Sequence, residues 1–460
     1  MIADQPSSGR FKEFLTEKVL FGNQPTPELI AILTVYFVQG ILGLARLAVS
    51  FFLKDDLGLS PTQVAALSGI AALPWVIKPV YGFLSDGLPL FGYRRRPYLI
   101  ISGIMGSASW IAMATVVNNY STAMVAMIAS SLSVAISDVI ADSLVAERAR
   151  HESLAKTGSL QSACWAASAT GGIITAYLSG WLLEHFSSQT VFLVTTTFPL
   201  IVTVVAWLIT EEVVSHKLNL GTVVYQVKQL RSAVTQKAIL LPLIFIFIWQ
   251  ATPGSESAFF FFTTNELGFE PEFLGRVHLV TSVASLIGVW LYQRYLKHVP
   301  FRVILGWTTV ISAILGMTTL ILVTHFNRTL GIDDHWFSLG DSLILAVAGR
   351  IALMPLFVLC ARICPAGIEA TLFALLMSVF NFGWTVSSEL GAILTHWLGV
   401  TETNFDNLWL LVLICNLSTL LPLPFLGLLP AAEEEAESLE VEEPIINDNI
   451  GVEEQLVVSN

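Results

Sequence analysis

The chain has 460 residues, of which 54% are hydrophobic and only 13% are charged, and its mean hydropathy is +0.71. Soluble globular proteins carry about 25% charged residues, so this composition excludes a soluble domain and indicates a multi-pass, all-α membrane protein. The formal net charge of −12 is uneven, because residues 431–460 hold ten of the 35 acids and no Lys or Arg. We therefore expect a nearly neutral membrane-embedded body followed by an acidic, disordered cytoplasmic tail over residues 430–460.

Runs of about 20 apolar residues predict twelve transmembrane helices. Before them, residues 1–27 are polar with aromatic residues at helical spacing, which favours a cytoplasmic or interfacial segment rather than a signal peptide. The twelve expected spans are 28–53, 61–84, 97–117, 121–147, 158–185, 189–209, 239–263, 272–293, 302–326, 341–363, 368–396 and 407–429.

The longest polar connection, residues 211–238, follows the sixth span. It divides the chain into an N-terminal six-helix bundle, 28–210, and a C-terminal six-helix bundle, 239–429. With the N-terminus in the cytoplasm, 17 of the 23 basic residues fall on the cytoplasmic side. Three lie outside and three lie within spans. This asymmetry predicts that both termini are cytoplasmic and that residues 211–238 form a cytoplasmic linker.

Two six-helix halves with a cytoplasmic linker are similar to the major facilitator superfamily, whose pseudo-symmetric halves rock around a central site. The loop after the second span, GFLSDGLPLFGYRRR, resembles that superfamily's Gly-x-x-x-Asp-x-x-Gly-Arg-Lys/Arg signature, although extra residues separate Asp86 from the basic cluster. The resemblance implies that Asp86, Arg94 and Arg95 form a cytoplasmic gate, an ion-pair latch between helices. Simple anchoring by positive charge is the alternative.

Ionisable residues concentrate in the first, fourth, seventh and tenth spans, which line the central cavity in the facilitator arrangement. Each costs about 2.5–3.5 kcal/mol to place near the middle of a membrane helix, so it is expected to face protein or water. Asp138 and Asp142 are four residues apart and share one helix face. They repel each other when both are ionised, so one is a candidate to carry a proton. The ionisable residues in these four spans are Arg46, Asp138, Asp142, Glu256 and Arg350.

The seventh span contains ATPGSES, in which Pro253 and Gly254 interrupt the helix just before Glu256. A broken helix at membrane depth is tolerated where it lines a cavity. A kink relieved by neighbouring helices is the alternative.

Three further polar residues are candidates for the substrate site. Lys78 lies near the cytoplasmic end of the second span, where it could also reach the interface. Gln39 lies mid-span beside Gly40 and Gly43, which predict close helix packing. Asn381 in the eleventh span either touches substrate or bonds across helices. Tryptophans in these spans are interpreted as packing residues, and Glu389 is expected near water at a span end.

Four stretches in order are similar to one family, the folate-biopterin transporters, over nearly the whole hydrophobic body. They are VYFVQGILGLARLAVSFFLKDDL, KPVYGFLSDGLPLFGYRRRPYL, SDVIADSLVAERAR and EATLFALLMSVFNFG. The resemblance implies transport of folates, pterins or related solutes. A carboxylate can accept the paired donors of a pterin edge, and arginine suits the carboxylates of a folate tail. The hypothesis assigns the edge to Asp138 or Asp142 and the tail to Arg46 and Arg350.

Other functions are disfavoured. The sequence lacks a zinc-protease His-Glu-x-x-His, a Gly-x-Ser-x-Gly and a phosphate-binding loop, so no enzymatic activity, metal or cofactor is expected. Basic residues cluster at span ends, which disfavours nucleic-acid binding. A carrier of another organic anion, a sugar or a drug remains the alternative. We expect a monomer in a lipid bilayer that imports or exports its solute, with protons as a candidate coupling ion. The absence of a transit segment favours a bacterial inner membrane over a plastid envelope.

Overall fold

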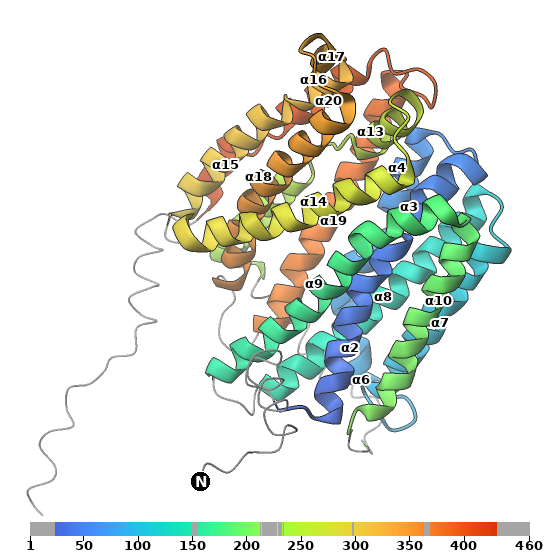
Figure 1. Ribbon diagram of the computed structural model, residues 1–460. Coiled ribbons are helices and arrows are strands. Elements are labelled where there is room, and N and C mark those ends of the chain that lie inside the picture. Colours follow the sequence, from blue (N-terminus) through green and yellow to red (C-terminus); the bar gives the residue numbers. More distant parts are fainter. Residues whose placement is uncertain are drawn as a thin grey trace, which may run out of the picture.

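The computed structural model describes residues 24–149, 154–211, 213, 228, 232, 234–296, 299–362 and 369–429, and Figure 1 shows their arrangement. This part of the chain is helical, with an isolated bridge between Leu90 and Tyr93 and no strand among the described residues. The acidic tail, almost all of the N-terminal segment and most of the central linker lie outside these ranges.

The first half contains six helical segments, two of which are interrupted. They are α2–η2–α3–η3 (Pro27–Ile41, Leu42–Leu44, Ala45–Phe51, Phe52–Asp56), α4–α5–α6 (Pro61–Ala71, Leu73–Val76, Lys78–Gly87), α7 (Arg96–Thr115), α8 (Tyr120–Ala149), α9 (Leu154–His185) and α10–η4 (Ser188–Val205, Ala206–Leu208).

The second half repeats this plan. Its segments are α12 and α13–η5 (Lys237–Gln250, Glu256–Phe261, Phe262–Glu266), α14–η6 (Pro271–Leu291, Tyr292–Leu296), α15–α16 (Phe301–Gly316, Thr319–Val323) with a short α17 (Phe326–Thr329), α18 (Asp334–Arg362), α19 (Glu369–Trp397) and α20–η7 (Leu408–Ser418, Leu423–Leu428).

Each of the twelve expected spans has a helical counterpart. Within the described residues, nine segments are long and apolar enough to cross a membrane. The other three expected spans correspond to α9, to α19 and to the broken pair α12 and α13. The predicted all-α fold of two six-helix halves is therefore confirmed.

Proline explains why the second span is broken. In an α-helix the N–H of residue 79 would bond to the carbonyl of residue 75, but Pro79 has no N–H. The carbonyl of Trp75 is therefore free to accept a hydrogen bond from elsewhere. Pro74 acts in the same way one turn earlier, so α5 is left as a single short turn between α4 and α6.

The halves share a hydrophobic core at one end only. We call the end that carries Arg95 and Arg302 the basic end, and the end that carries Lys54 the opposite end. At the opposite end, buried residues of both halves form common clusters, as where Leu47 packs with Phe269. Toward the basic end, one cluster lies wholly in the first half and another wholly in the second.

Direct contacts agree with this division. The α9 and α14 helices lie close together near α4 and diverge toward the basic end (Figure 1). At their junction Tyr177 donates to Glu272, 3.1 Å away. Beside it, Lys54 Nζ donates to Asn265 Oδ1 at 2.8 Å. The protein is thus closed at the opposite end.

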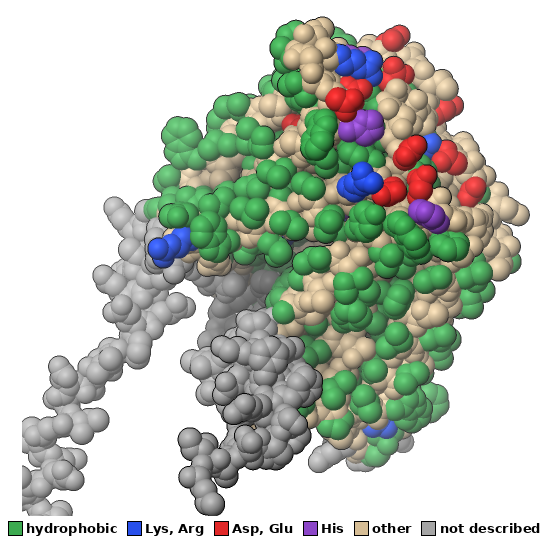
Figure 2. Space-filling model, viewed as in Figure 1, with side chains coloured by type: hydrophobic (Ala, Val, Ile, Leu, Met, Phe, Trp, Pro, Cys, Tyr) green, Lys and Arg blue, Asp and Glu red, His purple; other side chains and the backbone are tan. Residues whose placement is uncertain are grey.

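The surface fits a membrane environment. Figure 2 shows most of the charged side chains gathered near the opposite end, while the rest of this face is mainly hydrophobic. Large apolar side chains stay exposed on the helices, among them Val204 at 67%, Trp207 at 66% and Trp307 at 66%. Such exposure would be costly in water but suits lipid.

Candidate functional site

An ionic cluster joins three helices of the first half, and Asp142 is its exposed member. Lys78, the first residue of α6, forms an ion pair with Asp138 of α8, and their side chains are only 12% and 13% exposed. One turn along α8, Asp142 accepts a hydrogen bond from the hydroxyl of Tyr36 on α2. The predicted pair of aspartates therefore does share one face, and each carboxylate has its own partner.

Gln39 lies one turn from Tyr36 on α2, so it borders this cluster. Its side-chain Nε2 is buried and has no hydrogen-bond partner in the described part of the chain. The neighbouring glycines pack as expected. A Cβ at Gly40 would lie 2.0 Å from the carbonyl oxygen of Ser168 on α9, which confirms the prediction of close packing.

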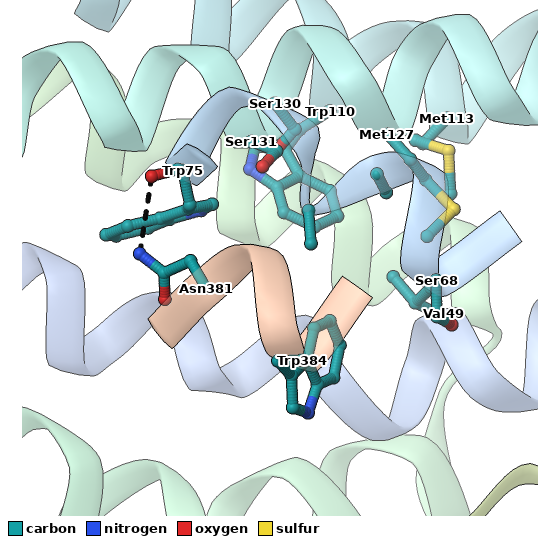
Figure 3. A pocket seen from close by; sticks show the side chains of 12 residues that line it. Val49, Ser68, Trp75, Trp110, Met113, Met127, Ser130, Ser131, Asn381 and Trp384 are labelled. Carbon is teal, nitrogen blue, oxygen red and sulfur yellow. Dashed lines mark hydrogen bonds between the residues drawn. The ribbon is translucent and has the colours of Figure 1, made fainter. Parts of the chain in front are cut away.

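A cavity of about 480 Å³ lies beside this cluster and is lined by both halves. Its wall is mostly apolar and aromatic, and none of its lining side chains is charged. Figure 3 shows three indole rings around it, from Trp75, Trp110 and Trp384. The lining residues are Val49, Ser68, Ala71, Ala72, Trp75, Trp110, Met113, Met127, Ser130, Ser131, Asn381 and Trp384.

Trp75 connects the cavity to the ionic cluster. Its ring lines the cavity, and the ammonium of Lys78 lies 4.9 Å from the ring centroid, within range of a cation–π interaction. Its carbonyl, freed by Pro79, accepts a hydrogen bond of 3.3 Å from Asn381 of α19 (Figure 3). Asn381 thus bonds across helices, as one of its two interpretations predicts, and it also lines the cavity.

The other three predicted charges do not join the cluster. Arg46 is exposed one turn before Val49 on the same helix, near His278 of α14. Arg350 is half-buried, and its side chain covers Gly288 of α14. Neither guanidinium has an ionic or hydrogen-bonding partner among the residues described.

Glu256 lies elsewhere. Its side chain is exposed beside Cys415 of α20 and reaches neither aspartate of α8. The five charges expected around the central cavity therefore do not form one cluster, and the tight ion pair lies within the first half.

The break in the seventh span is confirmed, but it does not line the cavity. Residues 251–255 leave helical geometry between α12 and α13, and α19 takes up the freed backbone groups. Ser387 donates to the carbonyl of Thr252 at 2.5 Å, and its own carbonyl accepts from the N–H of Gly254 at 3.3 Å. The kink relieved by a neighbouring helix is therefore the interpretation that the geometry favours.

The latch at the basic end is larger than predicted. Arg95 pairs with Asp86 at 2.7 Å and with Glu147 of α8 at 2.5 Å, and it donates to Ser85. Among the described residues, Arg94 contributes only its backbone N–H, which donates to Glu211 together with the N–H of Arg95. These contacts join spans of the first half to one another and to the start of the linker.

Sequence reasoning missed several of these residues. Tyr36 lies in an apolar run and carries no charge, so only its helical register could have pointed to Asp142. Glu147 and Glu211 lie near span ends, where acids are usually solvated. Asp341 of α18 accepts from the hydroxyls of Thr318 and Thr319 at the break before α16.

Glu389 requires a correction. It is partly buried against Gly69 of α4 instead of lying in water, and its Oε1 has no hydrogen-bond partner in the described ranges. The packing of α19 on α4 covers part of this side chain, which its position near a span end had placed in water.

Comparison with known proteins gives a consistent result. The sequence model of the BT1 family matches residues 39–450. A folate-biopterin transporter of Synechocystis is 65% identical over 422 residues, which are 92% of this chain and 85% of that protein. Folate transporter 2 of Plasmodium falciparum is 32% identical over 437 residues, 95% of each chain. A probable folate-biopterin transporter of Arabidopsis thaliana is 38% identical over 409 residues, 86% of this chain and 81% of that protein.

Solved structures resemble the fold at low sequence identity. A D-xylose-proton symporter has a TM-score of 0.64 and 15% identity, and the match covers 88% of this chain and 98% of that one. The nucleoside transporter NupG has a TM-score of 0.64 and 12% identity, with 87% of this chain and 98% of that one covered. These likenesses establish the arrangement of helices alone.

Proposed function

This chain belongs to the BT1 family, and from that premise we propose that it carries folates and pterins across a membrane by alternating access. Its similarity to folate-biopterin transporters extends over most of the chain. The observation that carries the proposal is the cavity between the halves, joined through Trp75 to a buried Lys78–Asp138 ion pair. A cavity beside unsolvated charge is the arrangement expected at a substrate pathway.

The distribution of basic residues supports a proposal for the sides of the membrane. We propose a bacterial inner membrane with the basic end in the cytoplasm and the protein acting as a monomer. The likeness to a cyanobacterial protein supports this placement. Because the halves are closed at the opposite end, the conformation described here is then the one that faces the cytoplasm.

The ion pair suggests how substrate and proton are coupled. A proton on Asp138 would release Lys78, whose buried ammonium then needs another anion. A folate tail carboxylate can supply that charge. Asp142, held by the hydroxyl of Tyr36, can pass a proton along the same face of α8. The guanidinium groups of Arg46 and Arg350 are without partners among the described residues, which supports their proposed role in holding the anionic tail.

Uptake assays test the proposal. The chain is expressed in a bacterial strain that can neither make nor import folate, and labelled folate uptake is followed over a pH series. We expect saturable uptake that biopterin inhibits and that increases as the outside becomes more acidic. Inhibition by an unrelated organic anion or sugar, but not by biopterin, would favour a carrier of another solute.

Variants of the aspartates connect that activity to the site. Asp138→Asn and Asp142→Asn should abolish folate uptake while protein remains in the membrane, as measured by immunoblot of membrane fractions. Glu256→Gln, a charged residue of the membrane region outside the cluster, is the matched comparison. Normal uptake by both aspartate variants would remove them from the transport site.

A further inference from the structure

The cavity and the ionic cluster have different chemistry, although they adjoin. The cluster offers charge from Lys78, Asp138 and Asp142, whereas the cavity wall carries no charged side chain. A folate also has two chemically different parts: a flat, uncharged bicyclic ring and a tail that ends in carboxylates. An uncharged wall would leave a carboxylate without its hydration and without a partner.

Three indole rings make the cavity suitable for a flat ring. Trp384 of α19 lines the cavity and is 42% exposed. Part of its side chain is therefore not covered by protein and can contact an occupant. Trp75 comes from the other half and lines the same cavity, and both side chains are drawn in Figure 3. Aromatic side chains bind planar heterocycles by stacking, and the cavity volume falls within the roughly 300–1,000 Å³ usual for small-molecule sites.

A few polar groups accompany the rings. Asn381, Ser130 and Ser131 are polar residues of the cavity wall. Trp110, 8% exposed, has an indole N–H with no hydrogen-bond partner within the described ranges. A mostly apolar wall with a few convergent donors and acceptors matches the polar edge of a heteroaromatic ring.

We propose that this cavity is the subsite for the pterin ring, stacked against Trp75 and Trp384 and facing the amide of Asn381. The inference rests on the proposed function and divides its substrate between two places. The ring occupies the uncharged cavity and the charged tail is left to cationic side chains outside it. Trp75 belongs to both places, because its other contact is the ammonium of Lys78.

This differs from the assignment made from sequence, in which an aspartate of α8 receives the pterin edge. Asp138 already pairs with Lys78, and Asp142 already accepts from Tyr36. Neither of these carboxylates lines the cavity.

Two fragments of the substrate separate the subsites. Biopterin carries the ring without the tail, and p-aminobenzoylglutamate carries the tail without the ring. Each is used to compete with labelled folate for binding to purified protein in detergent. We expect Trp384→Ala to weaken competition by biopterin by about ten-fold or more and to leave competition by p-aminobenzoylglutamate unchanged. Trp384→Phe, which keeps an aromatic face, should restore most of the loss.

Trp397→Ala is the matched control, because Trp397 lies on the same helix, is 76% exposed and does not line the cavity. Persistent binding of the tail fragment shows that each variant is folded. Equal weakening of both fragments, or of neither, by Trp384→Ala would overturn the ring subsite. Failure of the unaltered protein to bind folate at all would instead overturn the proposed function.

Discussion

At the scale of single residues, the Lys78–Asp138 pair shows how a membrane protein keeps charge inside. Both side chains are almost fully buried, so each needs the other's charge. Removing one partner of such a pair costs about 3–5 kcal/mol, because the remaining charge is left without compensation. Removing both leaves no such charge.

This gives the first prediction. Lys78→Ala should lower thermal stability in detergent more than the double variant Lys78→Ala/Asp138→Ala does, and all of these variants should fail to transport. Unfolding is measured by scanning fluorimetry of the two single variants and the double variant. If the double variant is destabilised by the sum of the single effects, the two residues do not interact and the ion pair is wrong.

The residue scale also shows where sequence reasoning is limited. Charged residues inside apolar runs are visible in a sequence because their cost is large, which is why Asp138, Asp142 and Lys78 could be found. The partner of a charge is set by packing between distant helices. Tyr36 is 106 residues from Asp142, and no spacing rule connects them.

At the scale of helices, proline and glycine determine where the spans can bend and meet. Pro79 frees the carbonyl of Trp75, which Asn381 then binds from the other half. The positions of Pro74 and Pro79 were visible in the sequence. That Asn381 would be the donor to the freed carbonyl of Trp75 was not. Tryptophan gave no usable signal either, since an aromatic residue in an apolar span packs against neighbours as readily as it lines a cavity.

The second prediction concerns this bond. Pro79→Ala returns an N–H to the helix, so the carbonyl of Trp75 can bond within its own span again. Loss of the bond to Asn381 should slow folate uptake by up to about ten-fold, since one hydrogen bond contributes about 0.5–1.5 kcal/mol. Pro97→Ala is a suitable control, because Pro97 is in the first turn of α7, where no helical hydrogen bond is missing. Equal uptake rates in the two variants would count against a role for the broken span.

The third prediction compares two glycines of α9. A Cβ at Gly180 would lie 2.3 Å from the carbonyl oxygen of Pro271 on α14, whereas one at Gly172 would meet nothing within 4 Å. Overpacking costs about 1–3 kcal/mol. Gly180→Ala should therefore disfavour the conformation that is closed at the opposite end, while Gly172→Ala should leave it unchanged.

The measurement is labelling of a cysteine that replaces Leu183 at that junction, in a background whose four native cysteines are replaced by Ser. Reaction with a water-soluble maleimide should be faster in the Gly180→Ala background than in the Gly172→Ala background. Identical labelling rates in both backgrounds would show that the close approach of α9 to α14 does not hold the halves together.

At the scale of the whole molecule, the halves share a core at one end and keep separate cores at the other. The twofold plan, the number of spans and the distribution of basic residues are all properties of composition along the chain, so sequence could predict them. Which end is closed depends on contacts between halves. Those contacts are made by ordinary apolar residues such as Leu47 and Phe269, and their pattern does not differ from that of any buried face.

The last prediction follows from this asymmetry. Lys54 and Asn265 lie in different halves and touch at the closed end. With cysteines at both positions, a short, cleavable bifunctional thiol reagent should join the halves there and stop folate uptake by intact cells. Cys164, Cys360 and Cys415 are buried, which favours selective reaction at the introduced pair. Cys364, which lies outside the described residues, is replaced by Ser in every variant. Cleavage by a reductant should restore uptake, and the Lys54→Cys single variant should be unaffected by the reagent. In the proposed orientation, with the basic end in the cytoplasm and away from the cross-link, inside-out vesicles of the cross-linked protein should still bind folate. Continued uptake with the cross-link in place would mean that transport does not require the two halves to separate at this end.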